Sequence, residues 1–366
     1  MRVLRFIVKF LSLVANGGAA LLLIASAYSD RVSPETSLLF SYLGLAFPLL
    51  CTVNLGFMCY WLFLGKWRYP LIGLCTFLVC WEPVKSYFPL HSRKEIPRGE
   101  VMKVLSYNVM GFGYKDHTRR SPNPILEYIA HSDADIVCLQ EYTVMKLGRG
   151  LTDTKIRRAL RMYPYRSVFY QRRSKYQDSG IAVYSKYPIS RSRTIKYKTD
   201  FNGSSIHELT VKGKRFTLVN NHLESFKLTM EDRSRYSSMI KNLNPDGLDD
   251  LRGAFSQKLS TAFLIRAKQA ERVTEEIRSA KGEYVLVCGD FNDTPISYAH
   301  RTVQGDLTDA FAASGRGAGI TYNQNCFWFR IDHILHSSNI TSMDCTVDKV
   351  PYSDHYPIWC YLRVDS

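Results

Sequence analysis

The chain has 366 residues, of which 46% are hydrophobic and 22% are charged. Its 48 Lys and Arg residues outnumber 33 Asp and Glu residues and give a formal net charge of +15. The length allows two domains, or one large domain with an appendage. Nine cysteines without a Cys-x-x-Cys pair give no zinc signature and no readable disulfide framework.

The first 100 residues contain three apolar stretches. Residues 10–28 and 36–65 carry no charge, and residues 69–81 form a shorter uncharged run. A membrane span needs about 20 mostly apolar residues. The first two stretches are therefore candidate spans, and the third reaches this length only if it extends to Leu90. We predict a transmembrane region over residues 1–90, with two or three spans, and a polar connector over residues 91–100.

Positive charges flank these stretches unequally. The basic residues are Arg2, Arg5 and Lys9 before the first stretch, Arg31 before the second, and Lys66 and Arg68 before the third. Because cytoplasmic loops are enriched in Lys and Arg, the N-terminus and the second loop are predicted to be cytoplasmic. Three spans then make a multi-pass protein of the cell (inner) membrane with a periplasmic, extracytoplasmic remainder. A cleaved signal peptide at the first stretch would leave this orientation unchanged.

From residue 101 onward, short apolar runs end in polar side chains. The runs cover residues 101–105, 135–139, 216–219 and 284–288, and their length predicts buried strands. Helices are predicted over residues 124–131 and 251–280, and paired strands over residues 165–170 and 179–184. Carboxylates, amides and imidazoles follow the strands. We therefore expect an α/β scaffold that places these reactive side chains together at one edge of the sheet.

Two further segments have a distinctive charge pattern. Residues 226–243 carry mixed charge and are predicted to form a lid or a membrane-facing flap. A basic cluster between Lys155 and Lys198 is typical either of a solvated surface or of a surface that attracts anionic lipid head groups or a nucleic-acid backbone.

Six polar motifs follow one another along residues 101–364. They are Ser106-Tyr107-Asn108, Leu139-Gln140-Glu141, Asn220-Asn221-His222-Leu223, Gly289-Asp290-Phe291-Asn292-Asp293, Arg330-Ile331-Asp332-His333 and Tyr352-Ser353-Asp354-His355. In this order they resemble the endonuclease/exonuclease/phosphatase superfamily, which includes deoxyribonucleases and neutral sphingomyelinases. The resemblance implies a four-layer α/β sandwich over residues 101–366, with two packed mixed β-sheets flanked by helices. It also implies a site at one end of the sandwich.

Oxygen donors dominate these motifs. They suit a hard divalent cation that keeps some of its waters, which means Mg²⁺ or Mn²⁺, and such ions usually handle phosphate oxygens. The resemblance implies that Glu141 is the principal metal carboxylate and that Asp354 adds charge on the metal side. It assigns Asn108 either to bracing the metal cluster or to contacting the phosphate of the substrate.

Other side chains are candidates for proton transfer and for substrate binding. Asp290 and Asn292 lie two apart at a strand end, where alternate side chains face the same way, and the resemblance implies that they orient the nucleophilic water. His355 is a candidate general base because imidazole titrates near neutral pH, with Asp332 orienting its second nitrogen. Whether His355 or Asp290 takes the proton stays open. His222 resembles a second catalytic histidine that bonds the phosphoryl oxygens or the leaving group.

Departures from two subfamily patterns narrow the function. Gln140-Glu141-Tyr142-Thr143 differs from the Gln-Glu-Thr-Lys of apurinic endonucleases, and Phe329-Arg330-Ile331-Asp332 differs from the Trp-Cys-Asp-Arg of inositol polyphosphate phosphatases. The prediction is a divalent-metal-dependent phosphoester hydrolase, anchored in the lipid bilayer, with a phospholipid head group or a nucleic acid as substrate. An inactive membrane-anchored binding module is disfavoured because every candidate catalytic position is filled.

Overall fold

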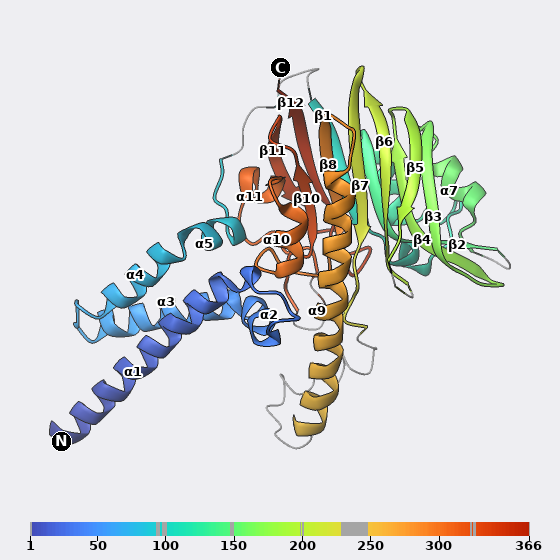
Figure 1. Ribbon diagram of the computed structural model, residues 1–366. Helices are drawn as coiled ribbons and strands as arrows, with labels where there is room; N and C mark the ends of the chain where they lie inside the picture. The colour runs from blue at the N-terminus through green and yellow to red at the C-terminus, as the bar shows by residue number, and fades with distance from the viewer. Residues whose placement is uncertain are drawn as a thin grey trace.

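Two six-stranded mixed β-sheets pack face to face at the centre of the computed structural model (Figure 1). The structure describes residues 2–92, 96, 101–146, 150–197, 199, 201–227, 248–322, 324 and 327–365. The first sheet has the order β11-β12-β1-β2-β4-β3, and the second has the order β5-β6-β7-β8-β10-β9. Each sheet holds one parallel pair, β1 with β2 and β7 with β8, among antiparallel neighbours.

The strands of the first sheet are β1 Val101–Asn108, β2 Ile136–Met145, β3 Tyr165–Arg173, β4 Gln177–Ser185, β11 Ile340–Val347 and β12 Ile358–Val364. Those of the second sheet are β5 Ile189–Ile195, β6 Gly203–Val211, β7 Lys214–His222, β8 Tyr284–Asp290, β9 Thr308–Asp309 and β10 Asp332–His336. Apolar side chains from both sheets form the core between them, including Val104, Ile136, Leu218, Leu286 and Ile334.

Helices cover the two outer faces of the sheets. α6 (Pro124–His131) and α7 (Asp153–Ala159) pack on the first sheet, and α9 (Leu248–Arg278) and α10 (Tyr298–Gln304) pack on the second. α11 (Ala310–Ser314) lies against β10 and β11, and the short 3-10 helix η2 (Met110–Tyr114) follows β1. The arrangement confirms the predicted four-layer α/β sandwich. The helix predicted over residues 124–131 is also confirmed, with the Asn123 side chain capping its first turn.

The N-terminal region is helical and projects from the sandwich (Figure 1). It contains α1 (Arg2–Ala27), η1 (Ser29–Arg31), α2 (Leu38–Leu45), α3 (Phe47–Phe63), α4 (Pro70–Val79) and α5 (Trp81–Tyr87). α1, α3 and α4 pack against one another. Within the described chain, α1 alone is long and apolar enough to cross a membrane; α2 and α3 qualify only if they count as one bent span.

The apolar stretch over residues 36–65 is not one straight helix as its composition suggests. It breaks at Ala46 with a bend of 62° between α2 and α3. Pro48 lies in the first turn of α3, where its missing N–H leaves no helix hydrogen bond unmade. The third stretch gives only the 10-residue α4, because the chain turns into α5 at Cys80.

The helical region is docked on the sandwich rather than joined only by a tether. The Tyr42 hydroxyl on α2 lies 2.9 Å from the Ser256 carbonyl oxygen and 2.8 Å from Ser260 Oγ on α9, and its ring meets Phe263 edge-on. At the other end of the region, Leu90 forms an isolated bridge with Arg316. The predicted connector, residues 91–100, lies mostly outside the described residues, as does most of the predicted lid over residues 226–243.

Candidate active site

Both sheets contribute polar side chains to one edge of the sandwich. Asn108 ends β1 and Glu141 lies on β2 in the first sheet, whereas His222 ends β7 and Asp290 ends β8 in the second. The parallel pairs deliver these side chains to the same edge, because parallel strands end on the same side of a sheet. Asp332 begins β10 directly opposite Asp290, and His222 is also in register with Asp290.

Glu141 owes its position to a β-bulge. The sequence suggests that the strand ends at Leu139, but β2 continues to Met145 with a register shift between Leu139 and Tyr142. Glu141 has φ of 52°, a left-handed conformation that is uncommon for a residue with a side chain. Bulges often re-aim a side chain beside an active site. Here the bulge leaves the Glu141 side chain 39% exposed, next to carboxylates that are buried.

The Asn108 side chain joins the two sheets. Its Nδ2 donates to Glu141 Oε1 at 3.2 Å and to Asp290 Oδ2 at 3.0 Å, and its Oδ1 accepts from the Met110 N–H at 3.1 Å. Asn108 therefore holds together two carboxylates that belong to different sheets, and its role in bracing a metal cluster or contacting the phosphate stays a prediction.

His355 and Asp332 form a directional pair. His355 Nδ1 lies 2.8 Å from Asp332 Oδ2, and the Nε2 atom on the other side of the ring lies 3.7 Å from Asp290 Oδ2. The Thr321 hydroxyl oxygen accepts from the backbone N–H groups of Ile331 and Asp332 and fixes the start of β10. The arrangement places an oriented imidazole beside a buried carboxylate.

Burial and mutual charge set the proton affinities of these groups. Burial is the largest influence on His355 and favours its neutral form, but the charges of Asp332, Asp290 and Asp354 together raise the pKa of His355 well above its usual range. Burial also raises the pKa of Asp290 to about 6, despite the opposing charge of His355. Burial lowers the pKa of His222. The site therefore combines an imidazole of raised pKa, an imidazole of lowered pKa and a carboxyl of raised pKa.

His222 faces the same carboxylates from β7. Its Nε2 lies 3.7 Å from Asp290 Oδ2 and 3.8 Å from Glu141 Oε1, which is beyond hydrogen-bond distance.

Asn292 departs from the arrangement that its spacing suggests. β8 ends at Asp290, so Asn292 lies in a turn with φ of 52° and not on the same face of a strand. Asp290 Oδ1 accepts from the Asn292 N–H at 2.8 Å, and Asn292 Nδ2 donates to the Leu223 carbonyl oxygen at 2.9 Å. Asn292 lines the catalytic cavity, but its side-chain N–H is engaged with the backbone.

Asp354 also lines this cavity, and the neighbouring Ser353 ties the motif to β1. The Ser353 hydroxyl donates to the Asn108 carbonyl oxygen at 2.8 Å. Burial and then the charges of Glu141 and Asp354 raise the pKa of Tyr114.

The donor set fits a hard divalent cation. Carboxylates from Glu141, Asp290 and Asp354 converge on one cavity, and Asp332 Oδ1 has no hydrogen-bond partner in the described chain. One ligand atom each from Asp290, Asp332 and His355 lie within 4.8 Å of one another. Carboxylate-rich sites of this kind suit Mg²⁺ or Mn²⁺.

Arg266 on α9 is a residue of the site that the sequence pattern did not indicate. Its guanidinium is fully buried, forms an ion pair with Asp293 at 3.0 Å, and donates to the carbonyl oxygens of Glu224 and Asn292. The sequence feature that could have indicated Arg266 is the presence of an arginine among the apolar positions of an amphipathic helix, between Ala262 and Ala270. Its effect is to anchor the Asn292 turn to the outer helix layer.

The catalytic cavity has a volume of about 130 Å³ and an apolar wall. The acidic side is formed by Glu141, Asp290 and Asp354. The apolar side is formed by Leu45, Phe226, Leu259, Phe327, Phe329 and Ile331. Leu45 is the last residue of α2, so the N-terminal helical region supplies part of the cavity.

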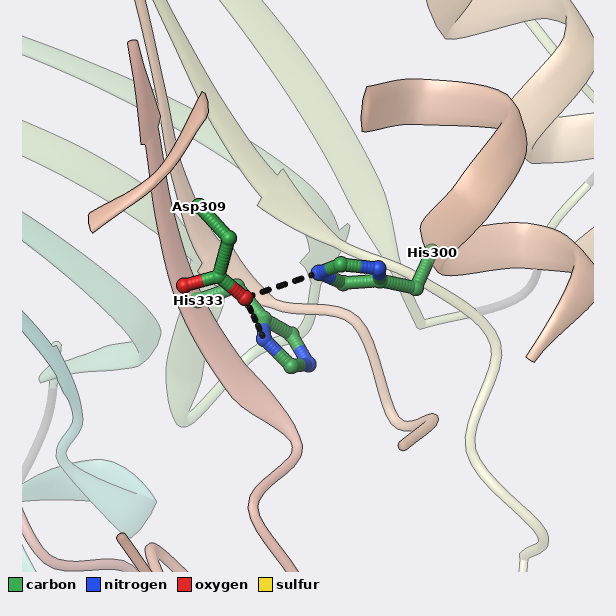
Figure 2. A group of neighbouring side chains, drawn as sticks. All are labelled: His300, Asp309 and His333. Atoms are coloured by element: carbon green, nitrogen blue, oxygen red, sulfur yellow. Dashed lines mark ion pairs between the residues drawn. The ribbon is translucent and has the colours of Figure 1, made fainter. Parts of the chain in front are cut away.

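A second polar group consists of His300, Asp309 and His333 (Figure 2). His300 Nε2 and His333 Nδ1 both face Asp309 Oδ2, at 3.2 and 3.8 Å, and His333 Nε2 lies 3.0 Å from the Asp293 carbonyl oxygen. Burial and repulsion by His300 lower the pKa of His333 to about 4. These residue types could hold a metal ion. Despite burial, the hydrogen bonds of His300 and His333 and the charge of Arg330 hold the pKa of Asp309 well below its usual range.

Part of the basic cluster lines a different groove, with a volume of about 600 Å³. Arg157, Arg161 and Arg191 lie on it, near the start of β3 and β5. Tyr165 pairs with Ser185, which pairs with Ile136 at the start of β2. This groove is therefore at the end of the sandwich opposite to Glu141. Arg172 and Arg173 instead pair with Ser179 and Asp178, which pair with Thr143 and Val144 at the Glu141 end of β2.

This chain resembles known proteins in sequence and in fold. The model of the Endonuclease/Exonuclease/phosphatase family matches residues 105–355, and a domain of unknown function matches residues 8–87. A search of the curated proteins gives no match.

Solved structures share the fold at low identity. An endonuclease/exonuclease/phosphatase from Beutenbergia cavernae is 14% identical over 73% of this chain and 72% of that chain, with a TM-score of 0.52. The human Nocturnin catalytic domain with bound sulfate is 17% identical over 75% and 96%, with a TM-score of 0.50. A family protein from Bacteroides vulgatus is 18% identical over 72% and 99%, also with a TM-score of 0.50.

Proposed function

Because the chain belongs to the endonuclease/exonuclease/phosphatase family, we propose that it is a membrane-anchored hydrolase of phosphodiester bonds that uses Mg²⁺ or Mn²⁺. The observation that carries the proposal is the Asn108 amide, which holds Glu141 and Asp290 together beside the Asp332–His355 pair. When bound by Glu141, Asp290 and Asp354, the ion would neutralise phosphoryl oxygens and acidify a water.

The side chains of the site account for the proton movements. The Asp290 carboxylate accepts a proton from the water whose oxygen bonds to phosphorus. His355 Nε2, 3.7 Å from Asp290, exchanges that proton with solvent. The phosphorus–oxygen ester bond opposite the water breaks, and the leaving alkoxide takes a proton from a solvent water. Asp332 keeps the imidazole oriented throughout, and His222 bonds a phosphoryl oxygen.

Membrane anchorage is part of the same proposal. Large apolar side chains are exposed along α1, with Phe6 at 70% and Phe10 at 56%, and Leu49 on α3 is 64% exposed. An apolar surface of this extent is costly in water. A bundle of α1, α3 and α4 in the bilayer would cover it.

Positive charge supports an orientation for this bundle. Lys9 Nζ lies 5.2 Å above the Tyr69 ring, so the start of α1 meets the turn between α3 and α4. That end of the bundle lies far from the sandwich (Figure 1). Lys66 and Arg68 lie in the same turn. Because positive residues favour the cytoplasmic side, the catalytic domain is proposed to be periplasmic or otherwise extracytoplasmic, with the bundle in the cell (inner) membrane.

The test is hydrolysis of bis(p-nitrophenyl) phosphate by the full chain in detergent micelles with Mg²⁺. We expect nitrophenol release by the wild type and a loss of at least about 10²-fold for Glu141→Gln, the scale of removing a group that stabilises transition-state charge. Glu127→Gln, on the solvent side of α6, is the matched control and should behave as the wild type. Equal turnover by Glu141→Gln would show the site to be misassigned.

A membrane-anchored module that binds without turnover is the competing hypothesis. It predicts no nitrophenol release by the wild type, even when binding of a phosphodiester is measurable. The presence of an oriented His355–Asp332 pair argues against it, since binding alone does not need a positioned proton-transfer group.

A further inference from the structure

The catalytic cavity is built from two regions of the chain. Glu141, Asp290 and His355 come from the sandwich, whereas Leu45 comes from the last turn of α2 in the N-terminal helical region. α3, which carries exposed apolar side chains, begins at Phe47, two residues after Leu45. The first large exposed apolar side chain of α3, Leu49, therefore follows the cavity-lining Leu45 by four residues.

The position of Leu45 is fixed by specific contacts. Tyr42, one turn earlier on α2, bonds Ser256 and Ser260 of α9 and packs edge-on against Phe263 at 5.5 Å between ring centroids. Gly44 lies so close to the sandwich that a Cβ there would meet the Ile296 carbonyl oxygen at 2.5 Å. This fit holds the end of α2 against the catalytic domain.

The remainder of the apolar wall is braced in the same way. The Phe226 ring packs edge-on against Phe263 at 5.6 Å, and the Arg266 guanidinium stacks over Phe226 at 4.7 Å. Leu259, Phe327, Phe329 and Ile331 continue this wall. The wall thus faces the phosphate-handling residues as an ordered surface.

The charge of the cavity disfavours a polyanion. Among the described lining residues there is one lysine, Lys227, which forms an ion pair with the buried Glu224 at 2.8 Å, and there is no arginine. Arg157, Arg161 and Arg191 lie in the groove at the far end of the sandwich, whereas Arg172 and Arg173 lie at the Glu141 end of β3 but outside the cavity lining. A nucleic-acid strand draws its affinity from phosphate contacts with Lys and Arg, and the lining of this cavity offers few of them.

We propose that the substrate is an amphipathic lipid phosphodiester of the bilayer, with its phosphate at Asp290 and His355 and its apolar part against Leu45 and the neighbouring wall. The inference rests on the proposed hydrolase function and adds the substrate class and a specificity residue to it. Water bonds to the lipid phosphorus, one ester bond breaks, and the released alkoxide takes a proton from a solvent water. Leu45 contributes to binding of the apolar part of the lipid and does not contact the reacting atoms.

The experiment compares the full chain with Leu45→Ser in dodecyl maltoside micelles. The substrates are dioleoyl phosphatidylcholine, phosphatidylethanolamine and phosphatidylglycerol in mixed micelles, bis(p-nitrophenyl) phosphate and a single-stranded oligodeoxynucleotide. We expect hydrolysis of at least one lipid, and a fall of about tenfold in the ratio of kcat/KM for lipid to kcat/KM for the small diester in Leu45→Ser. Leu39→Ser is the matched control: Leu39 is 62% exposed on the same helix, lies outside the cavity, and its replacement should leave the ratio unchanged.

The outcomes separate the two proposals. Turnover of bis(p-nitrophenyl) phosphate without turnover of any lipid would overturn the lipid assignment and leave the hydrolase intact. Preferred cleavage of the oligodeoxynucleotide, or an unchanged ratio in Leu45→Ser, would also overturn it. No turnover of any ester would instead count against the hydrolase. Dihexanoyl phosphatidylcholine below its micelle concentration distinguishes a dissolved lipid from a lipid of the membrane. Its cleavage at the rate of the bilayer lipids would overturn the assignment to a membrane-embedded substrate.

Discussion

The Arg330 guanidinium donates to the Ser86 carbonyl oxygen at 2.7 Å and so joins the strand that carries Asp332 to the last turn of α5. It also donates to the carbonyl oxygens of Tyr87 and Ala318, and its side chain is fully buried. The N-terminal helical region is therefore part of the structure that supports the Asp332–His355 pair, although α1, α3 and α4 extend away from it.

Arg330→Leu should destabilise the catalytic domain. The substitution removes a buried cation and leaves three backbone carbonyls without this donor and Asp309 without a balancing charge. Such losses cost about 3 kcal/mol or more. Thermal unfolding followed by intrinsic fluorescence should show a lowered Tm. Arg316→Leu removes an exposed arginine nearby and should stay within about 0.5 kcal/mol; equal shifts in both variants would contradict the role given to Arg330.

Turnover should require a divalent ion. The carboxylates of Glu141, Asp290 and Asp354 converge without a buried lysine or arginine to balance them in the cavity lining, and their charge calls for a cation. Exhaustive treatment with EDTA should abolish hydrolysis of bis(p-nitrophenyl) phosphate, and added Mg²⁺ or Mn²⁺ should restore it. Full turnover after chelation would exclude this dependence. Circular dichroism before and after chelation controls for unfolding.

His355→Ala and Asp290→Asn should each lower kcat by at least about 10²-fold, which is the usual scale for removing a positioned proton-transfer group. Asp290 ends β8 and His355 lies in the loop before β12, so the fold should survive. The control is His131→Ala, which removes an exposed histidine of α6. Near-normal turnover in either site variant, with an unchanged circular dichroism spectrum, would mean that proton transfer uses other groups.

Stability should fall as the pH drops below neutrality, partly because of His207. This histidine is 1% exposed, and burial lowers its pKa to about 3. An unfolded histidine has a pKa of about 6.5, so the unfolded chain binds more protons between about pH 3 and 6.5 and stability is lost as the pH falls through that window. From pH 7 to 5 the loss from His207 is about 2 kcal/mol.

His207→Gln tests this assignment. Glutamine is able to hydrogen-bond Ser192 and Ser205, which flank His207 at 2.9 and 2.8 Å, but it does not titrate. Chemical denaturation at pH 7 and pH 5 should therefore show a smaller loss of stability in the variant than in the wild type. An identical loss in both proteins would assign the pH dependence to other groups.

Reporter fusions after Leu90 test the orientation. A reporter that is active only outside the cytoplasm should give signal, and one that is active only inside should not, because Lys66 and Arg68 are expected on the cytoplasmic side. A fusion after Lys66 is the internal control and should give the reverse pattern. If only the cytoplasmic reporter gave signal at Leu90, the proposed orientation would be wrong and the substrate would lie within the cell.

Local patterns predicted much of the fold. The apolar run before Asp290 gives β8, the periodicity after residue 251 gives α9, and alternation gives the β3–β4 pair, since each pattern reflects burial on one face. The family resemblance predicted that His355, Asp332 and Asp290 belong to one site. Features set by contacts over long sequence separations were missed.

Three differences illustrate this limit. The bulge at Glu141 depends on how β2 pairs with β4, and the Asn292 turn is held by Arg266 from another layer. The bend after Leu45 follows from the docking of Tyr42 onto α9, 214 residues later in the chain. No window of the sequence around any one of these residues contains its partner.

The division of the site between the two sheets has a mechanical consequence. Glu141 belongs to the first sheet and Asp290 to the second, and Gln140 Nε2 already donates across the interface to Asn220 Oδ1 at 2.8 Å. An ion shared by Glu141 and Asp290 would act as a cross-link between the layers, in the way that a ligand stabilises the state to which it binds. Amide hydrogen exchange should then slow in β2 and β8 together when Mg²⁺ is added, while the exchange of α6 stays the same.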